Sequence, residues 1–219
     1  MRKLAINTFL SLDGVMQAPG GPDEDPTGGF AHGGWATVHF DDEMMSRMNP
    51  AEPYELLLGR GTYEIFAAHW PYAEGPIADQ LNSIRKHVAS TTLDRVEWSN
   101  STLIRGDVPE YVAALKLQDG PEIQVHGSPG LIQTLLRTDL VDELRVWTFP
   151  LLLGAGKRLF GSGTLPVALT LVDSRTSTTG VIIGRYVPEG RVHTGSFARK
   201  APSAAELARR EKWLEEEKA

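Results

Sequence analysis

Two glycine-containing turns have the residue types that can hold a phosphate group. Residues 59–62 (Gly-Arg-Gly-Thr) and residues 127–130 (Gly-Ser-Pro-Gly) each follow an apolar, strand-like run. Where a strand passes into a helix, outward backbone N–H groups and the helix dipole favour an anion, and glycine allows close approach. Arg60 and Thr62 add side-chain donors. Each turn alone also fits an ordinary tight turn, but two of them in one small chain favour a shared nucleotide.

Carboxylates lie beside a long glycine-rich stretch and are candidates for proton transfer. Asp13 ends the first apolar run, and Asp41 and Asp42 follow the stretch itself. Reduction of a C=N bond requires a proton for nitrogen, which a carboxyl group or an ordered water can supply. Local structure is the alternative role, because Asp13 suits a turn with Gly14 and either of the other two suits a helix cap.

The chain lacks the residues that several other kinds of reaction centre require. The chain has no cysteine, which excludes disulfides, thiolate zinc sites and cysteine nucleophiles. The six histidines show no metal-ligand spacing, and neither a Gly-x-Ser-x-Gly elbow nor a Rossmann fingerprint is present. Residues 153–158 resemble part of an NTPase P-loop, but that motif needs glycine and Ser or Thr where the chain has Leu151 and Arg158. We predict no metal site and no NTPase loop.

The elements that must position these residues alternate along most of the chain. Apolar and β-forming runs predict strands at 3–10, 54–58, 85–90, 101–105, 122–126 and 142–149, the first of them central. Helical spacing predicts helices at 41–48, 62–68, 76–84, 131–137 and 108–117, the last capped by Asp107. Residues 167–174 and 178–187 predict a closing antiparallel pair. We expect an α/β fold with a mostly parallel central sheet, an antiparallel C-terminal hairpin and flanking helices.

Two segments stand outside this alternation. Residues 17–40 form a long loop that carries Trp35 and Phe40, and loops of this length are usually functional lids or disordered segments. Residues 198–219 are highly charged and predict a helix with a capping box at Ser203 and Glu206. This tail is either solvated or docked on a partner subunit through Leu207, Trp213 and Leu214. We divide the chain into one domain at 1–197 and a charged helical tail at 198–219.

Net charge and hydropathy restrict the kinds of partner that the chain can bind. The net charge of the 219-residue chain is -6, and an acidic surface argues against nucleic acid as main partner, because phosphate backbones require a basic field. No stretch approaches the roughly 18 apolar residues of a membrane span, and the N-terminus makes a poor signal peptide. We expect a cytoplasmic protein that binds neither nucleic acid nor membrane.

In chain order, the motifs resemble one known family. They run Ser11-Leu12-Asp13-Gly14, Gly33-Gly34-Trp35, Phe40-Asp41-Asp42-Glu43, Leu58-Gly59-Arg60, Thr62-Tyr63-Glu64, His87 to Leu93, Val125-His126-Gly127-Ser128, Leu140 to Leu144, and Leu153 to Phe160. The set is similar to the dihydrofolate-reductase-like proteins over about residues 3–187. It is more closely similar to the C-terminal reductase domain of bacterial riboflavin-biosynthesis deaminase–reductases, of which this chain would be a stand-alone member.

The resemblance implies NADPH lying across the carboxyl edge of the sheet. It assigns cofactor phosphates to the first turn, the adenosine side to a Ser/Thr segment and the pyrophosphate to the second turn. The residues implied are, in that order, Gly59, Arg60 and Thr62; Ser90, Thr91 and Thr92; and Gly127, Ser128, Gly130 and Leu131. Thr8 and the neighbourhood of Asp13 would border the nicotinamide, and the acid of dihydrofolate reductases would fall near Asp41 or Asp42.

We therefore expect an NADPH-dependent reductase that transfers hydride to a pteridine-like or related planar heterocycle. Asp13 and then Asp42 are the predicted catalytic residues, and Trp35, Phe40 and Pro150 would wall the substrate pocket. The second turn lacks the Gly-Gly pair of dihydrofolate reductases. A non-catalytic nucleotide-binding protein that keeps the fold is therefore the alternative. A homodimer assembled through the tail is compatible with either function.

Overall fold

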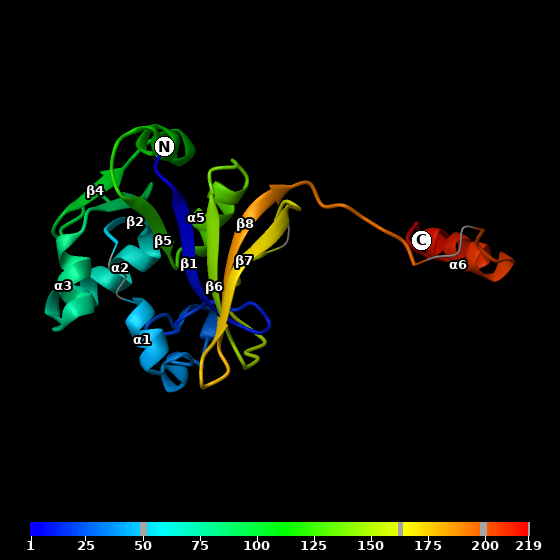
Figure 1. The fold of residues 1–219 in the computed structure, drawn as a ribbon, viewed down its shortest axis with the longest axis horizontal. Coiled ribbons are helices and arrows are strands. Elements are labelled where there is room, and N and C mark those ends of the chain that lie inside the picture. The colour runs from blue at the N-terminus through cyan, green and yellow to red at the C-terminus, as the bar shows by residue number, and fades with distance from the viewer. Residues whose placement is uncertain (49–51, 162–163, 198–200, 219) are drawn as a thin grey trace.

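One eight-stranded sheet organises the molecule. The computed structural model describes residues 1–48, 52–161, 164–197 and 201–218. The strand order is β4-β3-β2-β5-β1-β6-β8-β7 (Figure 1). The strands are β1 Leu4–Ser11, β2 Tyr54–Gly59, β3 Lys86–Ala89, β4 Ser101–Ile104, β5 Glu122–His126, β6 Glu143–Phe149, β7 Ala168–Thr176 and β8 Ile182–Gly190.

The pairing confirms the predicted sheet. Strands β1 to β6 pair in parallel, and β1 lies centrally, with Ile6 opposite Val125 of β5 and Leu144 of β6. Strand β8 is antiparallel to both β6 and β7. Strand β7 runs two residues past its predicted end and β8 begins four residues later than predicted, because the turn lies at 177–181, where the Ser177 N–H donates to Val181 O at 2.9 Å.

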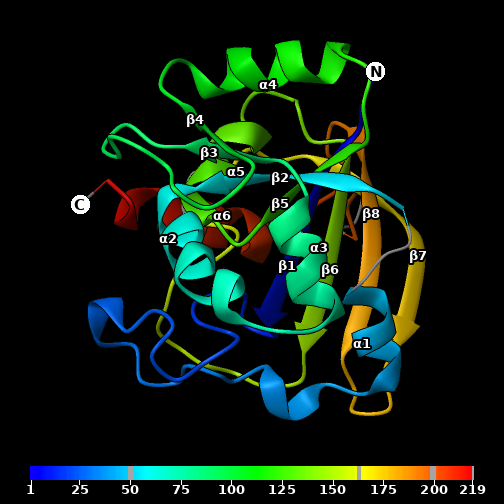
Figure 2. The same ribbon diagram turned by 90° about the vertical axis from the view of Figure 1, so that its left-hand side faces the viewer.

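Helices cover both faces of the sheet. The described helices are α1 Asp42–Met48, α2 Arg60–His69, α3 Pro76–Ser83, α4 Val108–Leu117, α5 Pro129–Leu136 and α6 Ala204–Glu216, with short 3-10 turns at Thr27–Gly29, Thr37–His39 and Trp70–Tyr72. Helix α6 lies away from the sheet (Figure 1). Helices α4 and α5 pack on one face through Val112, Leu115 and Ile132. Helices α2 and α3 cover β2 and β3 on the other face (Figure 2).

The 17–40 loop supplies part of a second core. Phe30 and Trp35 pack with Trp147 and Phe149 of β6 on the same sheet face as α2 and α3, beyond the part that those two helices cover. The loop is thus an ordered cover for this end of the sheet. Its aromatic residues explain why, since each buries a large apolar area.

Helix starts follow from local chemistry. The Asp107 carboxylate accepts a hydrogen bond from the Glu110 N–H at 2.7 Å, which confirms the predicted cap of α4. Helices α2 and α5 begin two residues earlier than predicted. Extended Gly59 precedes α2, and Pro129 occupies the first position of α5, where its missing N–H costs nothing.

The tail contains the predicted helix. The Ser203 hydroxyl accepts from the Glu206 N–H at 3.2 Å, as a cap requires. The Glu206 carboxylate itself pairs with Arg209 and Arg210. Residues 198–200 and 219 of the predicted tail lie outside the described residues, and the division into domain and tail stays a prediction. Among the described helices, none combines the length and apolar character that a membrane crossing needs.

Candidate functional site

The carboxyl ends of the parallel strands bring the two predicted turns together. Strands β2 and β5 are neighbours, so the turns that follow them lie side by side. The Gly59 N–H donates to Ser128 Oγ at 2.9 Å, and the Ser128 N–H donates to Thr62 Oγ1 at 2.9 Å. Ser128 Oγ also donates to His126 O at 3.1 Å. The two turns therefore form one hydrogen-bonded unit.

Close packing at this junction requires glycine. Gly127 has φ +56°, and a Cβ there would lie 2.7 Å from Thr62 Oγ1. A Cβ on Gly59 would lie 3.4 Å from the Ser128 side chain. Ser128 itself is left-handed, with φ 60°. An L side chain at position 127 would thus be strained and would displace Thr62.

Both helix N-termini at this junction are open. A Cβ on Gly61 or on Gly130 would meet nothing within 4 Å, and neither α2 nor α5 has a side-chain cap. The first N–H groups of a helix have no acceptor within the helix. Each helix therefore begins with backbone donors that no side chain caps, and this donor chemistry fits the phosphates of a nucleotide.

Arg60 connects the junction to the segment after β3. Its Nη1 donates to Thr92 Oγ1 at 3.2 Å, and its Nε lies 3.9 Å from the Glu64 carboxylate. Ser90 Oγ accepts the N–H groups of Thr92 at 3.1 Å and of Leu93 at 3.0 Å. Thr91 is exposed between them. The structure places the first turn, the second turn and residues 90–92 along one stretch of the sheet edge.

Asp13 has a structural role at another part of the same edge. Its carboxylate accepts hydrogen bonds from Ser11 Oγ at 2.6 Å, from the Leu153 N–H at 3.1 Å and from the Gly154 N–H at 2.8 Å. Arg158 lies at 3.3 Å. The Ser11 hydrogen bond, followed by that from Leu153, holds the pKa of Asp13 well below its usual range. Asp13 is therefore ionised at neutral pH.

Asp41 and Asp42 have different environments. Asp41 accepts from the Met44 N–H at 2.9 Å and from the Thr178 N–H at 2.8 Å. It thus caps α1 and ties that helix to the β7–β8 turn. The Met44 hydrogen bond, the largest cause, lowers the pKa of Asp41. Asp42, the predicted catalytic residue, is exposed in the first turn of α1.

The predicted substrate residues lie beside the second core. Trp35 is 7% exposed and donates Nε1–H to Gln17 O at 2.7 Å. Phe40 is partly buried, with its ring centroid 5.6 Å from that of Phe9. Pro150 is exposed just after β6, and Thr8 is buried within β1. Packing explains Trp35 in this structure, and the substrate contacts of these residues stay predictions.

Arg158 and Gln17 also lie near this edge of the sheet, and the sequence reasoning gave neither residue a role. Gln17 is buried, accepts the Lys157 N–H at 3.0 Å and donates to Asp25 O and Thr27 O. The 17–40 loop is thereby tied to residues 153–158. The glycine-rich stretch at 153–158 was the available signal, although nothing in it indicated its partners.

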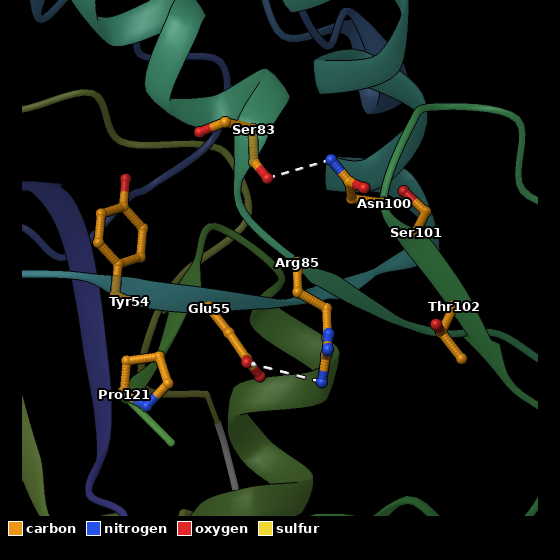
Figure 3. Close-up of a pocket in the computed structure, with 8 residues that line it drawn as sticks. All are labelled: Tyr54, Glu55, Ser83, Arg85, Asn100, Ser101, Thr102 and Pro121. Carbon is orange, nitrogen blue, oxygen red and sulfur yellow. Dashed lines mark hydrogen bonds and ion pairs between the residues drawn. The ribbon is translucent and has the colours of Figure 1, made fainter.

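A separate pocket lies at the opposite edge of the sheet. It has a volume of about 450 Å³ and is lined mainly by polar side chains (Figure 3). Its Glu55 carboxylate binds Arg2 at 2.7 Å and His87 at 3.0 Å, with Arg85 at 3.8 Å. Burial lowers the pKa of His87. None of the predicted site residues lines this pocket. Among the described residues, no group of three or more His, Asp or Glu side chains is placed to hold a metal ion.

Comparisons with known proteins agree with this geometry. YyaP of Bacillus subtilis (strain 168), an uncharacterized protein, is 26% identical over 186 residues, which cover 83% of this chain and 92% of that protein. A protein of Shewanella sp. PV-4 named for riboflavin biosynthesis has a similar structure, with a TM-score of 0.61 at 22% identity over 86% of this chain and 99% of that one. Dihydrofolate reductase from Enterococcus faecalis, solved with NADP(H), gives a TM-score of 0.55 at 13% identity over 85% and 96%.

These likenesses show a dihydrofolate-reductase-like fold. The family model described as the RibD C-terminal domain matches residues 2–183, which is most of the chain. The chain therefore belongs to the RibD C-terminal domain family, a family of reductases.

Proposed function

We propose that this protein is an NADPH-dependent reductase that transfers hydride to a pteridine-like or related planar heterocycle. The observation that carries the proposal is the junction of the turns after β2 and β5, where Gly59, Thr62 and Ser128 are hydrogen-bonded to one another below two open helix N-termini. The NADP(H) complex of Enterococcus faecalis dihydrofolate reductase, which shares the fold, supports it.

The donor set suits a nucleotide with an additional phosphate. The N–H groups at the starts of α2 and α5 suit the pyrophosphate, since helix N-termini favour anions. Arg60 lies beside the junction, and its guanidinium donates a hydrogen bond to the Thr92 hydroxyl in the segment after β3. A guanidinium can bind two phosphate oxygens at once. We therefore assign the phosphate that distinguishes NADPH from NADH to Arg60, with the hydroxyls of Ser90 and Thr92 beside it.

The bound nicotinamide would supply the hydride, and the chain's own residues would position the substrate and deliver a proton. Asp13 stays ionised and fixes the backbone of residues 153–154, so its role is to position the substrate side of the edge. Asp42 is exposed and is the candidate to supply the proton, either directly or through water. Phe40 and Pro150 would contact the planar ring.

Turnover is tested by following the loss of NADPH absorbance with dihydropterins, flavins and aminopyrimidines. We expect at least one class to be reduced, and we expect Arg60→Ala to raise the KM for NADPH more than it lowers kcat. The alternative is a nucleotide-binding protein without turnover. NADPH binding with no turnover on any heterocycle would support that alternative.

A further inference from the structure

A chain of polar side chains crosses the sheet face beside the turn junction. Arg145 of β6 binds the two carboxylate oxygens of Glu122, each at 2.7 Å. The Gln124 amide nitrogen donates to Glu122 Oε1 at 2.9 Å. The Gln124 carbonyl oxygen lies 3.1 Å from Asn7 Nδ2 and 2.9 Å from His126 Nε2. The network thus runs from β6 through β5 to β1, and it ends at two partly buried side chains, Asn7 and His126.

The hydrogen-bond directions in this network are fixed from its charged end. A guanidinium only donates, so the Glu122 carboxylate accepts from Arg145 and also from the Gln124 amide nitrogen. The Gln124 oxygen therefore faces away from Glu122, and a carbonyl oxygen only accepts. Asn7 must then present its NH2 group to Gln124, and His126 must present an N–H at Nε2.

Each of these two side chains keeps one free acceptor atom. Burial, followed by the positive charge of Arg145, lowers the pKa of His126 to about 4. The ring is therefore neutral at pH 7, and a proton on Nε2 leaves a lone pair on Nδ1. Among the residues that the structure describes, neither His126 Nδ1 nor Asn7 Oδ1 has a hydrogen-bond partner, and neither atom is sealed from solvent.

The two acceptors lie beside the candidate site. Asn7 and His126 are register partners on neighbouring strands, so their side chains project from the same sheet face. His126 ends β5 at the second turn, and its carbonyl accepts the Ser128 hydroxyl at 3.1 Å. Two residues beyond Asn7 on the same face, the Phe9 ring centroid lies 5.6 Å from that of Phe40. A planar ring held against these aromatic side chains would have an edge near Asn7 and His126.

We propose that Asn7 and His126 together recognise an exocyclic amino group on the heterocycle. An amino group has two N–H bonds, one for Asn7 Oδ1 and one for His126 Nδ1, whereas an oxo group would oppose its lone pairs to theirs. Amino-substituted rings are therefore selected over their oxo or methyl counterparts, because a missing donor leaves the acceptors unpaired. The inference rests on the proposed function for the kind of ring that binds, and it narrows the substrate within that class.

Nitrogen NMR tests the proton arrangement without any turnover. In the nitrogen-15-labelled chain at pH 7, His126 should be neutral with its proton on Nε2, and the spectrum of His126→Phe assigns its signals. Adding 2,4-diaminopteridine should shift the Nδ1 signal toward that of a hydrogen-bonded nitrogen. The compound 2,4-dimethylpteridine, which has a similar shape and no N–H, should not. Gln124→Met removes the carbonyl and should no longer hold the proton on Nε2. A charged ring, or a proton on Nδ1, in the natural chain would overturn the inference.

Binding of the same two compounds tests the recognition itself. The natural chain, with and without NADPH, should bind 2,4-diaminopteridine about tenfold or more tightly than 2,4-dimethylpteridine, which is the scale of a lost hydrogen bond. His126→Phe keeps a ring against Tyr54, whose centroid lies 6.0 Å away, and should abolish this preference. Tyr54→Phe is the matched control and should retain it. A natural chain without the preference, or a His126→Phe chain that keeps it, would show that the inference is wrong.

NADPH titration of the same samples separates this inference from the reductase proposal. A chain that fails to bind NADPH but prefers the diamino compound would refute the reductase function and keep the recognition by Asn7 and His126. A chain that binds NADPH without the preference would keep the reductase function and refute the recognition. If His126→Phe weakens NADPH binding and leaves the preference unchanged, the two acceptors bind the nicotinamide carboxamide instead, which also contradicts the inference.

Discussion

The Thr62 hydroxyl accepts the backbone N–H of Ser128 at 2.9 Å, while the Ser128 hydroxyl accepts the N–H of Gly59 at the same distance. This reciprocal pair crosses from α2 to α5 and fixes the N-termini of the two helices relative to each other. A nucleotide that bound at both helices would meet donors already in place, which reduces the ordering required on binding.

Removing the Thr62 hydroxyl should loosen this junction. Thr62→Val keeps the shape of the side chain but leaves the Ser128 N–H without its acceptor, so we expect a loss of about 1–3 kcal/mol of unfolding free energy. NADPH affinity should fall as well. Urea unfolding and NADPH titration measure the two effects. Thr62→Ser retains the oxygen and is the matched control; equal effects of both substitutions would show that the hydrogen bond is unimportant.

Two glycines of the second turn should respond in opposite ways to the same change. Gly127→Ala places a Cβ 2.7 Å from Thr62 Oγ1 at positive φ, so we expect a destabilisation of more than about 1 kcal/mol. Gly130→Ala adds a Cβ in open space inside α5 and should stabilise the protein by up to about 1 kcal/mol. Thermal unfolding compares them. A tolerated Gly127→Ala would contradict the described packing.

The sequence predicted the regular elements well because their signals are local. The strand at β5, the start of α4 at Asp107 and the central place of β1 follow from apolar runs, turn residues and strand–helix alternation. Contacts between distant segments were not predictable in this way. Trp35 lies in the 17–40 loop, which by its length could equally have been disordered, and only its packing on β6 decides its place. Lys86 lies at the start of a predicted strand, and its full burial depends on α3.

The site residues also fall into those that local signals predicted and those that depend on contacts between distant segments. Both turns could be located from strand–turn–helix order, and their proximity follows from parallel pairing of β2 and β5. The hydrogen bonds of Asp13 with Leu153 and Gly154 join residues 140 and 141 positions apart. No spacing rule links them.

Substitutions of Asp13 and Asp42 should have different effects, the first on stability and the second on proton delivery. Asp13→Asn weakens the hydrogen bonds from Leu153 and Gly154, so we expect a loss of about 1 kcal/mol of unfolding free energy. The native pKa of Asp13 lies below its unfolded value, so this stabilisation is present above about pH 4 and is lost as the pH falls through the native pKa. Asp42→Asn should lower kcat with little change in stability. Chemical unfolding between pH 2 and 7, combined with initial rates, measures both; the reverse pattern would exchange the two roles.

Lys86 should give the protein a distinctive alkaline pH dependence. Its side chain is fully buried and donates to Leu81 O at 2.6 Å and to Ile84 O at 2.8 Å. Burial lowers the pKa of Lys86 to about 8, below the 10.5 of an exposed lysine. Between these values the unfolded chain binds more protons than the native one, so the free energy of unfolding should rise with pH, by at most roughly 1.4 kcal/mol per pH unit.

Lys86→Met removes this titration and is the control. The difference in unfolding free energy between the natural chain and Lys86→Met should shift in favour of the natural chain from pH 8 to pH 10. A difference that stays constant over this range would show that the Lys86 pKa is not lowered.

Equilibrium binding of NADPH tests the central claim most directly. Purified protein is titrated with NADPH and with NADH, using the natural chain, Arg60→Ala and Arg60→Lys. We predict micromolar binding of NADPH, weaker binding of NADH, and a loss of about 1–3 kcal/mol in NADPH binding for Arg60→Ala. Arg60→Lys should fall between the two, because it keeps the charge without the planar fork. Absence of NADPH binding to the folded natural chain would contradict the proposed function.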